Sequence, residues 1–443
     1  MEFKNKKFIL IIFVILFLLL AGVGVFLLLS KAKDNDNNGE VKNVELVYWG
    51  LWEPSSVMQP LIDEYESTHP GVKILYSQQT SSNYESRLFT RLQQASSSTE
   101  PAPDIFRVHN TWIPKYYSYL SPLPEKVMTR DQYSQTFYPT ALSDFTAKNG
   151  KLYAIPLEID GLVLFYNKQL LTNAGFSEPP KDWDSITDLA HKLTKKDSSG
   201  KIIQAGLAIG TSRNILHAPE ILSFLLLQEG VELIDSTRTN VTLNTAKVES
   251  VLNVYTGFAT GKQAVWSSDL RYDLEMFYSG KLAMMIAPSW RAFDVILSSP
   301  TIEFGMATLP QLGANQQKVY YSTYWGEAVN KSSPNAEVAW DFVNFLAQKE
   351  SLVTKFSNES KLRAFGEPYS LVELNSSMSG NSYLTAIAEM APYMKSWQMG
   401  DETIVKQALN QLITSVVEDG QDPSTALKNA QEDINDQLAQ TNK

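Results

Sequence analysis

The order of strand-like and helix-like segments near the start of the folded part constrains the fold of this chain more than any other feature. Residues 44–49 (VELVYW) alternate and are rich in β-forming side chains, residues 57–69 carry apolar side chains at helical spacing, and residues 72–76 are strand-like again. Two strands joined through a helix form a parallel βαβ unit, and ligands bind at the ends of such strands. The pattern therefore predicts an α/β fold with a ligand crevice.

The alternation of strands and helices continues along the chain. Asp182 is placed to cap the helix that follows it, because its side chain can accept a hydrogen bond from the free amides there. The chain has 443 residues, and the part from residue 44 onward exceeds what one core usually encloses, so two domains are expected. We expect helices at 84–95, 168–173, 183–193 and 336–348, strands at 104–108, 280–287 and 301–308, and a helical stretch at 402–440 broken at 420–423.

Apolar residues fill positions 8–29 without interruption. The run has 22 residues, and a membrane-spanning helix needs about 20. Three lysines precede it, so the positive-inside rule places the N-terminus in the cytoplasm and the remainder outside. We predict one transmembrane anchor in residues 1–30, a flexible tether at 31–43, and a main domain at 44–443 on the extracytoplasmic face of the cell membrane. A cleaved signal peptide is the alternative, although its apolar core would span only about 7 to 15 residues.

The composition excludes several classes of chemistry. The sequence contains no cysteine, which excludes disulfides, thiolate metal ligands, a cysteine nucleophile and a lipid-modified N-terminal cysteine. Its formal net charge of −10, without a basic run outside the anchor flank, argues against a nucleic-acid partner. The four histidines lack metal-binding spacing, and the sequence has no G-x-S-x-G, H-E-x-x-H or phosphate-cradling glycine motif. We therefore expect no metal, no other cofactor and no catalytic residues.

Six segments spread over nearly the whole chain after residue 44 carry a combined signature. They are LVYWGLW (46–52), YESTHPG (65–71), PAPDIFRVHNTW (101–112), GKLYAIPLEIDGLVLFYNKQLLTNAGFSEPPKDWDSI (150–186), YSGKLAMMIAPSW (278–290) and PNAEVAWDFVNFL (334–346). In this order and at these spacings they resemble the family 1 extracellular solute-binding proteins of ABC importers, which include maltose- and other oligosaccharide-binding proteins. The chain departs from many members of that family because it lacks the lipid-anchored cysteine.

The resemblance implies a two-lobed periplasmic-binding-protein-like fold of type II, preceded here by the transmembrane helix. It places the chain crossings between the lobes near residues 152–156, 302–305 and 330–334. Lobe one would then hold residues 44–151 and 305–330, and lobe two would hold residues 157–302 and 334–443. The implied protein is a monomer that hands its ligand to the permease subunits of an importer.

Aromatic and polar side chains gather where strand ends should meet the cleft. A sugar presents flat C–H faces and many hydroxyls, so a site for it needs stacking rings and hydrogen-bonding carboxylates or amides. The candidate ligand-binding residues are Trp49, Trp52, His109, Asn110, Trp112, Tyr324, Trp325 and Glu327 in lobe one, and Glu158, Asp160, Arg213 and Trp290 in lobe two. By the resemblance, Trp290 and Asp160 occupy positions that face the cleft.

The predicted function is capture of a carbohydrate, most simply an oligosaccharide, between two closing lobes. Two other binding functions stay open, a protein for another small polar solute and a subunit of a sensory receptor. The enzymatic alternative is a surface glycosidase that would pair Glu158 with Asp160 or Glu327, because such hydrolysis requires two carboxylates. A cationic ligand such as a polyamine is disfavoured by Arg213 in the expected cleft.

Overall fold

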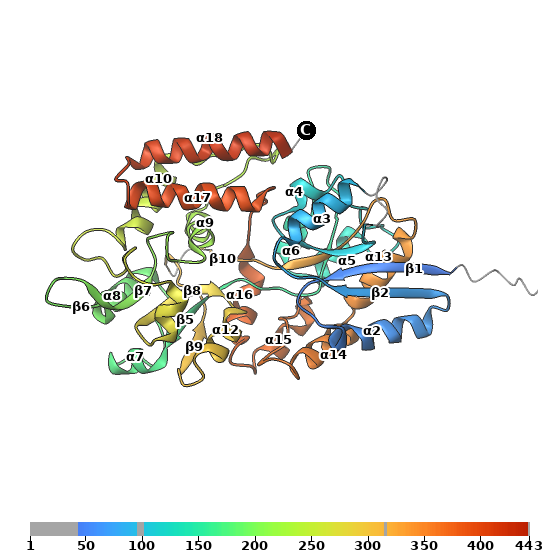
Figure 1. The fold of residues 1–443 in the computed structure, drawn as a ribbon, viewed down its shortest axis with the longest axis horizontal. Coiled ribbons are helices and arrows are strands. Elements are labelled where there is room, and N and C mark those ends of the chain that lie inside the picture. Colours follow the sequence, from blue (N-terminus) through green and yellow to red (C-terminus); the bar gives the residue numbers. More distant parts are fainter. Residues whose placement is uncertain (1–42, 95–101, 314–316, 442–443) are drawn as a thin grey trace, which may run out of the picture.

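The computed structural model describes residues 43–94, 102–313 and 317–441, which form two α/β lobes side by side (Figure 1). Each lobe is built around its own five-stranded sheet. The α/β fold with two lobes, predicted from the alternation of segments and from the length of the chain, is confirmed.

Lobe one contains the predicted βαβ unit, in which β1 pairs in parallel with β2. Its strands, in the sheet order β2-β1-β3-β11-β4, are β1 (Val44–Gly50), β2 (Val72–Gln78), β3 (Ile105–His109), β4 (Ile155–Pro156) and β11 (Trp325–Val329). Its helices are α2 (Ser55–Thr68), α3 (Tyr84–Gln93), α4 (Ile113–Tyr116), α5 (Arg130–Thr136), α6 (Pro139–Asp144), α13 (Ala336–Leu346), α14 (Lys349–Glu359), η1 (Val372–Leu374) and α15 (Asn375–Met378). Every second residue of β1 from Val44 to Tyr48 is buried, as the period-two pattern predicts.

Lobe two is built on the sheet β6-β7-β8-β5-β9. Its strands are β5 (Leu162–Asn167), β6 (Lys195–Lys196), β7 (Ile202–Ala208), β8 (Leu282–Pro288) and β9 (Phe304–Ala307). Its helices are α7 (Lys168–Asn173), α8 (Trp183–Leu193), α9 (Ala218–Gln228), α10 (Ala246–Gly257), α11 (Asp273–Tyr278), α12 (Arg291–Ser298), α17 (Glu402–Val417) and α18 (Pro423–Thr441). Every residue of β5 and β8 is buried, which fits apolar central strands covered on both faces. The cap on α8 is confirmed, because the Asp182 carboxylate accepts a hydrogen bond from the Ser185 amide at 2.8 Å.

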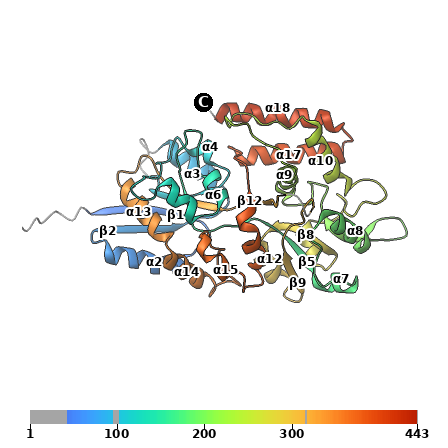
Figure 2. The same ribbon diagram turned by 180° about the vertical axis from the view of Figure 1, so that it is seen from behind.

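The chain passes between the lobes three times. The first crossing, residues 157–161, leads from β4 to β5, and the second, residues 308–324, leads from β9 to β11 through β10 (Tyr320–Tyr321). The third, residues 379–400, contains α16 (Thr385–Met390), η2 (Ala391–Tyr393) and β12 (Met394–Lys395). β10 pairs in parallel with β12, and Gly161 bridges to Ser322, so the three crossings lie side by side. Figure 2 shows β12 between the lobes.

The predicted lobe boundaries are wrong in the C-terminal half. Residues 305–307, assigned to lobe one, belong to β9, which pairs with β5 in lobe two. No crossing occurs at the predicted position 330–334, because the Asn330 amide donates to the Asp104 carbonyl within lobe one. Helices α13 and α14, assigned to lobe two, instead pack on α2 in lobe one. The third crossing therefore comes about 50 residues later than the sequence pattern suggested.

The predicted anchor, residues 1–30, and residues 31–42 of the predicted tether lie outside the described residues. Among the residues that are described, no helix combines the length and the apolar character needed to cross a membrane.

Candidate functional site

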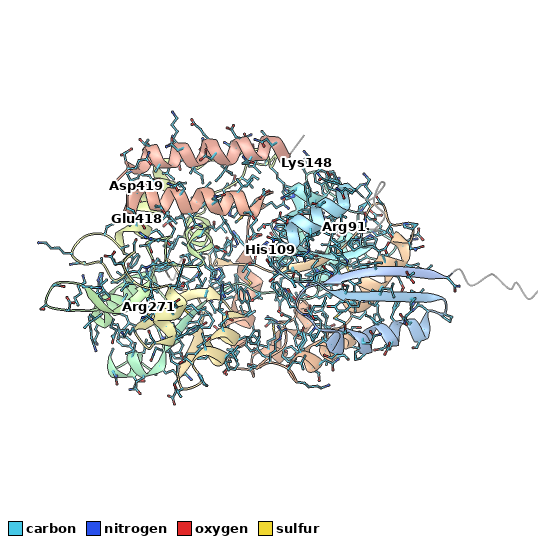
Figure 3. All side chains as sticks on the ribbon, viewed as in Figure 1. Arg91, His109, Lys148, Arg271, Glu418 and Asp419 are labelled. Carbon is cyan, nitrogen blue, oxygen red and sulfur yellow. The ribbon has the colours of Figure 1, made fainter. Side chains whose placement is uncertain are left out.

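A cleft with a volume of about 450 Å³ lies between the two lobes, alongside the crossings. Lobe one contributes Trp52, Ser81, His109, Trp325, Arg363 and Glu367, and the crossings contribute Glu158, Asp160, Thr323 and Tyr324. Lobe two contributes His217, Glu220, Pro288, Trp290, Phe293, Glu402 and Lys406. In Figure 3, His109 is labelled between the lobes. Several of these side chains follow the carboxyl ends of strands, which is where ligands bind in α/β sheets.

Tryptophan rings from both lobes face the cleft. Trp52 follows β1 and Trp290 follows β8, and they are 41% and 39% exposed, whereas the other seven tryptophans, all at described positions, are buried or partly buried. The Trp325 ring stands edge-on to Trp52, with a centroid distance of 6.2 Å. The Arg291 guanidinium lies 4.2 Å from the centroid of the Trp290 ring. The cleft therefore presents flat apolar surfaces on opposing walls.

Two carboxyl groups on the first crossing line the cleft between these rings. Asp160 is buried and accepts a hydrogen bond from the Gly161 amide at 2.7 Å. Burial raises the pKa of Asp160 to about 8, against the lowering effect of the Ser289 hydroxyl. Glu158 accepts a hydrogen bond from Arg107 at 2.5 Å, yet burial still raises its pKa. Both groups can exchange hydrogen bonds with hydroxyl groups in the cleft.

Polar contacts join the lobes at the start of α17. Glu402, in the first turn of that helix, lies 3.1 Å from His109 and accepts a hydrogen bond from the Trp112 indole at 2.8 Å. Lys406, one turn later, pairs with Glu402 at 2.5 Å and with Glu220 at 2.8 Å. Burial opposes the ionisation of Glu402, but His109 and Lys406 hold its pKa well below the usual value. This wall of the cleft is therefore an ordered network of charges.

A second group of charged side chains is buried behind the cleft in lobe one. Arg107, only 1% exposed, pairs with Glu158 at 2.5 Å, Glu327 at 3.1 Å and Glu53 at 3.4 Å. Burial raises the pKa of Glu327 to about 7, with Arg107 opposing the rise. Burial also acts to raise the pKa of Glu53, but Arg107 and Lys355 bring it below its ordinary value. The cluster holds the first crossing, through Glu158, against the sheet of lobe one.

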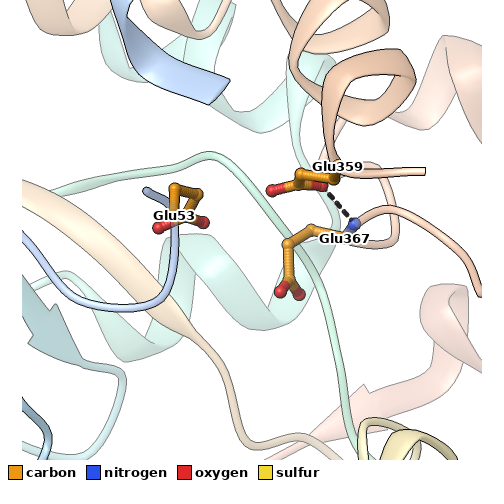
Figure 4. A group of neighbouring side chains, drawn as sticks. All are labelled: Glu53, Glu359 and Glu367. Carbon is orange, nitrogen blue, oxygen red and sulfur yellow. Dashed lines mark hydrogen bonds between the residues drawn. The ribbon is translucent and has the colours of Figure 1, made fainter. Parts of the chain in front are cut away.

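Three carboxylates of this region approach one another closely enough to hold a metal ion. Oxygen atoms of Glu53, Glu359 and Glu367 lie within 4.8 Å of one another, and Figure 4 shows the three side chains. Lys355 pairs with Glu53 at 2.9 Å and with Glu359 at 2.6 Å. Arg363 pairs with Glu367 at 2.7 Å and with Glu359 at 3.3 Å. Each of the three carboxylates is therefore already ion-paired with Lys355 or Arg363.

Seven of the twelve candidate ligand-binding residues line the cleft. They are Trp52, His109, Glu158, Asp160, Trp290, Tyr324 and Trp325. Tyr324 is almost fully buried, and its hydroxyl donates to Asp144 at 2.9 Å, so this residue mainly positions the second crossing.

Three other candidates in lobe one point away from the cleft or are covered. Trp49 lines a separate hollow with Arg87, because it sits in a strand in which successive side chains point to opposite faces. Asn110 is fully buried and donates to Asp144 at 3.1 Å. Trp112 stacks on Tyr116 and gives its indole N–H to Glu402.

Two charged candidates are also placed elsewhere. Glu327 points into the buried cluster, where it pairs with Arg107. Arg213 is exposed and pairs at 3.6 Å with Glu418, the residue that follows α17, away from the cleft. The sequence argument against a cationic ligand, which depended on Arg213, is therefore wrong.

The sequence reading missed several residues of the cleft, including His217, Glu220, Phe293, Arg363, Glu367, Glu402 and Lys406. Glu402 and Lys406 are spaced i, i+4, which is the spacing of an ordinary solvated helix pair. For Glu220 the sequence offered one signal, the apolar composition of α9, which includes LSFLLL after Glu220. A helix this apolar is buried, so a carboxylate in its first turn is buried too and needs a polar partner.

The chain is similar in sequence to several bacterial binding proteins. The chain is 26% identical over 360 residues to the diacetylchitobiose binding protein of Streptomyces coelicolor, covering 77% of this chain and 79% of that protein. It is 25% identical over 242 residues to the maltooligosaccharide ABC transporter solute-binding lipoprotein of Streptococcus pneumoniae serotype 4, covering 53% and 54%. A putative binding protein of Brucella abortus is 22% identical over 338 residues, covering 75% and 79%.

Solved structures share the fold. The chain resembles a cyclo/maltodextrin-binding protein complexed with maltotetraose, with a TM-score of 0.72, 19% identity and coverage of 89% and 97%. It also resembles an ABC substrate-binding protein from Listeria monocytogenes in complex with cycloalternan, with a TM-score of 0.68, 20% identity and coverage of 90% and 100%. Residues 50–352 match the bacterial extracellular solute-binding protein family. The resemblance of the six sequence segments is thus confirmed, and the chain belongs to the bacterial extracellular solute-binding protein family.

Proposed function

We propose that this protein is the extracytoplasmic component of an ABC importer that captures an oligosaccharide between its two lobes. The observation that carries the proposal is the pair of exposed tryptophans, Trp52 and Trp290, which face one cleft from opposite lobes. A large exposed apolar side chain within a cleft marks a ligand surface. The C–H face of a pyranose ring can stack on such flat aromatic rings.

The polar residues of the cleft suit the hydroxyls of such a ligand. Asp160, Glu158 and Thr323 lie on the crossings between the tryptophans, so their oxygens can meet hydroxyl groups along the edge of a stacked sugar. Relatives named for diacetylchitobiose and maltooligosaccharides, and structural neighbours bound to maltotetraose and mannobiose, support a saccharide as the ligand.

The buried contacts of the cleft carboxyl groups favour binding over catalysis. A glycosidase needs one carboxylic acid and one carboxylate that both reach the scissile bond. Glu158 is held by Arg107 at 2.5 Å, and Glu327 lies in the buried cluster behind the cleft. A binding protein does not need two carboxyl groups at one bond, so Glu158 can contact the ligand from the cleft while Glu327 stays in the buried cluster.

Anchoring by the apolar run at residues 8–29 completes the proposal. A transmembrane helix would keep the main domain at the outer face of the membrane, within reach of the permease subunits of the importer. The cysteine-free sequence leaves no thiol for a lipid anchor.

The test is calorimetric titration of the full chain, purified in a detergent without a sugar head group, with maltotetraose, mannobiose and diacetylchitobiose. We expect at least one saccharide to bind and to raise the melting temperature, because a ligand of the folded state stabilises by RT ln(1 + [L]/Kd). Trp52→Ala should abolish most of that shift. Trp49→Ala, three residues earlier but outside the cleft, is the matched control and should leave it unchanged. Absence of binding by all three saccharides would contradict the proposal.

A further inference from the structure

One carboxylate oxygen in the wall of the cleft is left without a partner. Glu220 lies in the first turn of α9, lines the cleft and is only 5% exposed. Its Oε1 atom pairs with Lys406 at 2.8 Å and with the His217 ring at 3.3 Å. Its Oε2 atom is buried and has no hydrogen-bond partner among the residues that the structure describes. A buried polar atom without a partner costs free energy, so its retention in a cleft calls for an explanation.

The surroundings of Glu220 keep it ionised. Burial acts to raise its pKa, but the Lys406 charge and the His217 contact lower it to about 2. The first turn of α9 adds to this effect, because the free amides of a helix N-terminus favour negative charge. At neutral pH the side chain is therefore a fixed anion with two acceptor oxygens, of which one is engaged by the protein.

The cations that reach the cleft are already balanced by carboxylates. Lys406 pairs with both Glu220 and Glu402. Arg363 pairs with Glu359 and Glu367. Among the described residues that line the cleft, Lys406 and Arg363 are the lysine and arginine side chains, so an acidic ligand would meet no unpaired cation of either type.

We infer that Glu220 is a ligand-contact residue whose Oε2 atom accepts a hydrogen bond from a hydroxyl of a neutral saccharide, and that it excludes saccharides bearing a carboxylate there. This inference rests on the proposed function and adds to it the charge class of the ligand. A hydroxyl donor would satisfy the one unpartnered oxygen, whereas a carboxylate would place like charges together in a site that water reaches poorly.

The experiment compares the wild-type chain with Glu220→Gln, Glu220→Asp and the control Glu249→Gln. Glu249 is a partly buried carboxylate on α10 of the same lobe, outside the cleft. The ligands are maltotetraose, mannobiose and diacetylchitobiose, each with a counterpart in which the C6 hydroxymethyl groups are oxidised to carboxylates. Melting temperature without ligand reports whether each variant folds.

We expect the wild type to prefer the neutral form of the saccharide that it binds. Glu220→Gln should weaken that binding by about 10- to 100-fold, the range for a hydrogen bond to a charged group. The substitution should also reduce the ratio between the affinity for the neutral saccharide and the affinity for its oxidised counterpart. A purely structural role of Glu220 would not change that ratio. Glu249→Gln should bind like the wild type. If Glu220→Gln does not fold, Glu220→Asp provides the test, because it keeps the charge and withdraws the oxygen, and should weaken binding while keeping the preference.

The failures of the two proposals are distinguishable. If a saccharide binds the wild type and the folded Glu220 variants equally well, the role of Glu220 is refuted while the proposed function stands. If the wild type binds the oxidised form more tightly than the neutral form, only the inference that the ligand is a neutral saccharide is refuted. If none of the saccharides binds the wild type, the proposed function fails and this inference fails with it.

Discussion

Replacement of Trp290 by alanine should weaken saccharide binding without unfolding the protein. Trp290 is 39% exposed, and the Arg291 guanidinium already lies over its ring, so the exposed part is the surface that a ligand can cover. A fully covered aromatic side chain buries up to about 250 Å², so roughly 100 Å² remains available on Trp290. At about 25 cal/mol per Å², covering half or all of it contributes about 1.2 to 2.5 kcal/mol.

That range corresponds to a loss of affinity of about 7- to 60-fold for Trp290→Ala. The assay is calorimetry with the saccharide that binds the wild type, and Trp290→Phe should lose less because it retains a stacking ring. The melting temperature without ligand should change little, since the removed side chain is exposed and makes few core contacts. A folded Trp290→Ala variant that binds with wild-type affinity would refute the stacking argument.

Three further predictions concern stability and topology. Arg107→Met should lower the free energy of unfolding by about 3 to 5 kcal/mol in urea titrations, because it leaves buried carboxylates without their cation; a change under about 1 kcal/mol would contradict this reading. The pKa of Asp160 is raised to about 8 in the folded state, against about 3.9 in the unfolded chain. Between these pH values the folded state holds a proton that the unfolded chain has lost, so the free energy of unfolding falls as the pH rises. Asp160→Asn should therefore flatten the fall in melting temperature from pH 4 to 8, and an unchanged slope would exclude that titration. The protein should fractionate with membranes, and protease added to intact cells should digest its main domain. Release of a soluble form starting near residue 33 would instead show that the N-terminal segment is cleaved and is not an anchor.

The elements could be predicted from the sequence because their signals are local. The alternation in β1, the helical spacing in α2 and the Asp182 cap of α8 each depend on a few neighbouring residues. The path between the lobes could not be predicted in this way. β9 pairs with β5 across about 140 residues of sequence, and α13 returns to α2 across nearly 280, and no periodicity encodes such pairings.

The residues of the candidate site could likewise be predicted only where their signal was local. Trp52 and Trp290 follow strands of the two sheets, so the rule that ligands meet strand ends found both. Arg213 also follows a strand, but its loop turns the side chain towards Glu418. Glu220 and Lys406 come from helices, where a carboxylate and a lysine usually mark a solvated face, and they meet only through tertiary packing.

The central claim is that a saccharide is captured by closure of the two lobes, and a distance measurement across the cleft tests it most directly. The chain has no native cysteine, so Leu297→Cys on α12 and Val353→Cys on α14 would carry spin labels at exposed positions on lobe two and lobe one. Ligand can favour the closed form only through contacts absent from the open one. We predict that a saccharide shown by calorimetry to bind shifts the label distances to shorter values, and that the shift is lost at the same concentration in the Trp290→Ala background. Identical distance distributions with and without the bound saccharide would contradict capture by closure.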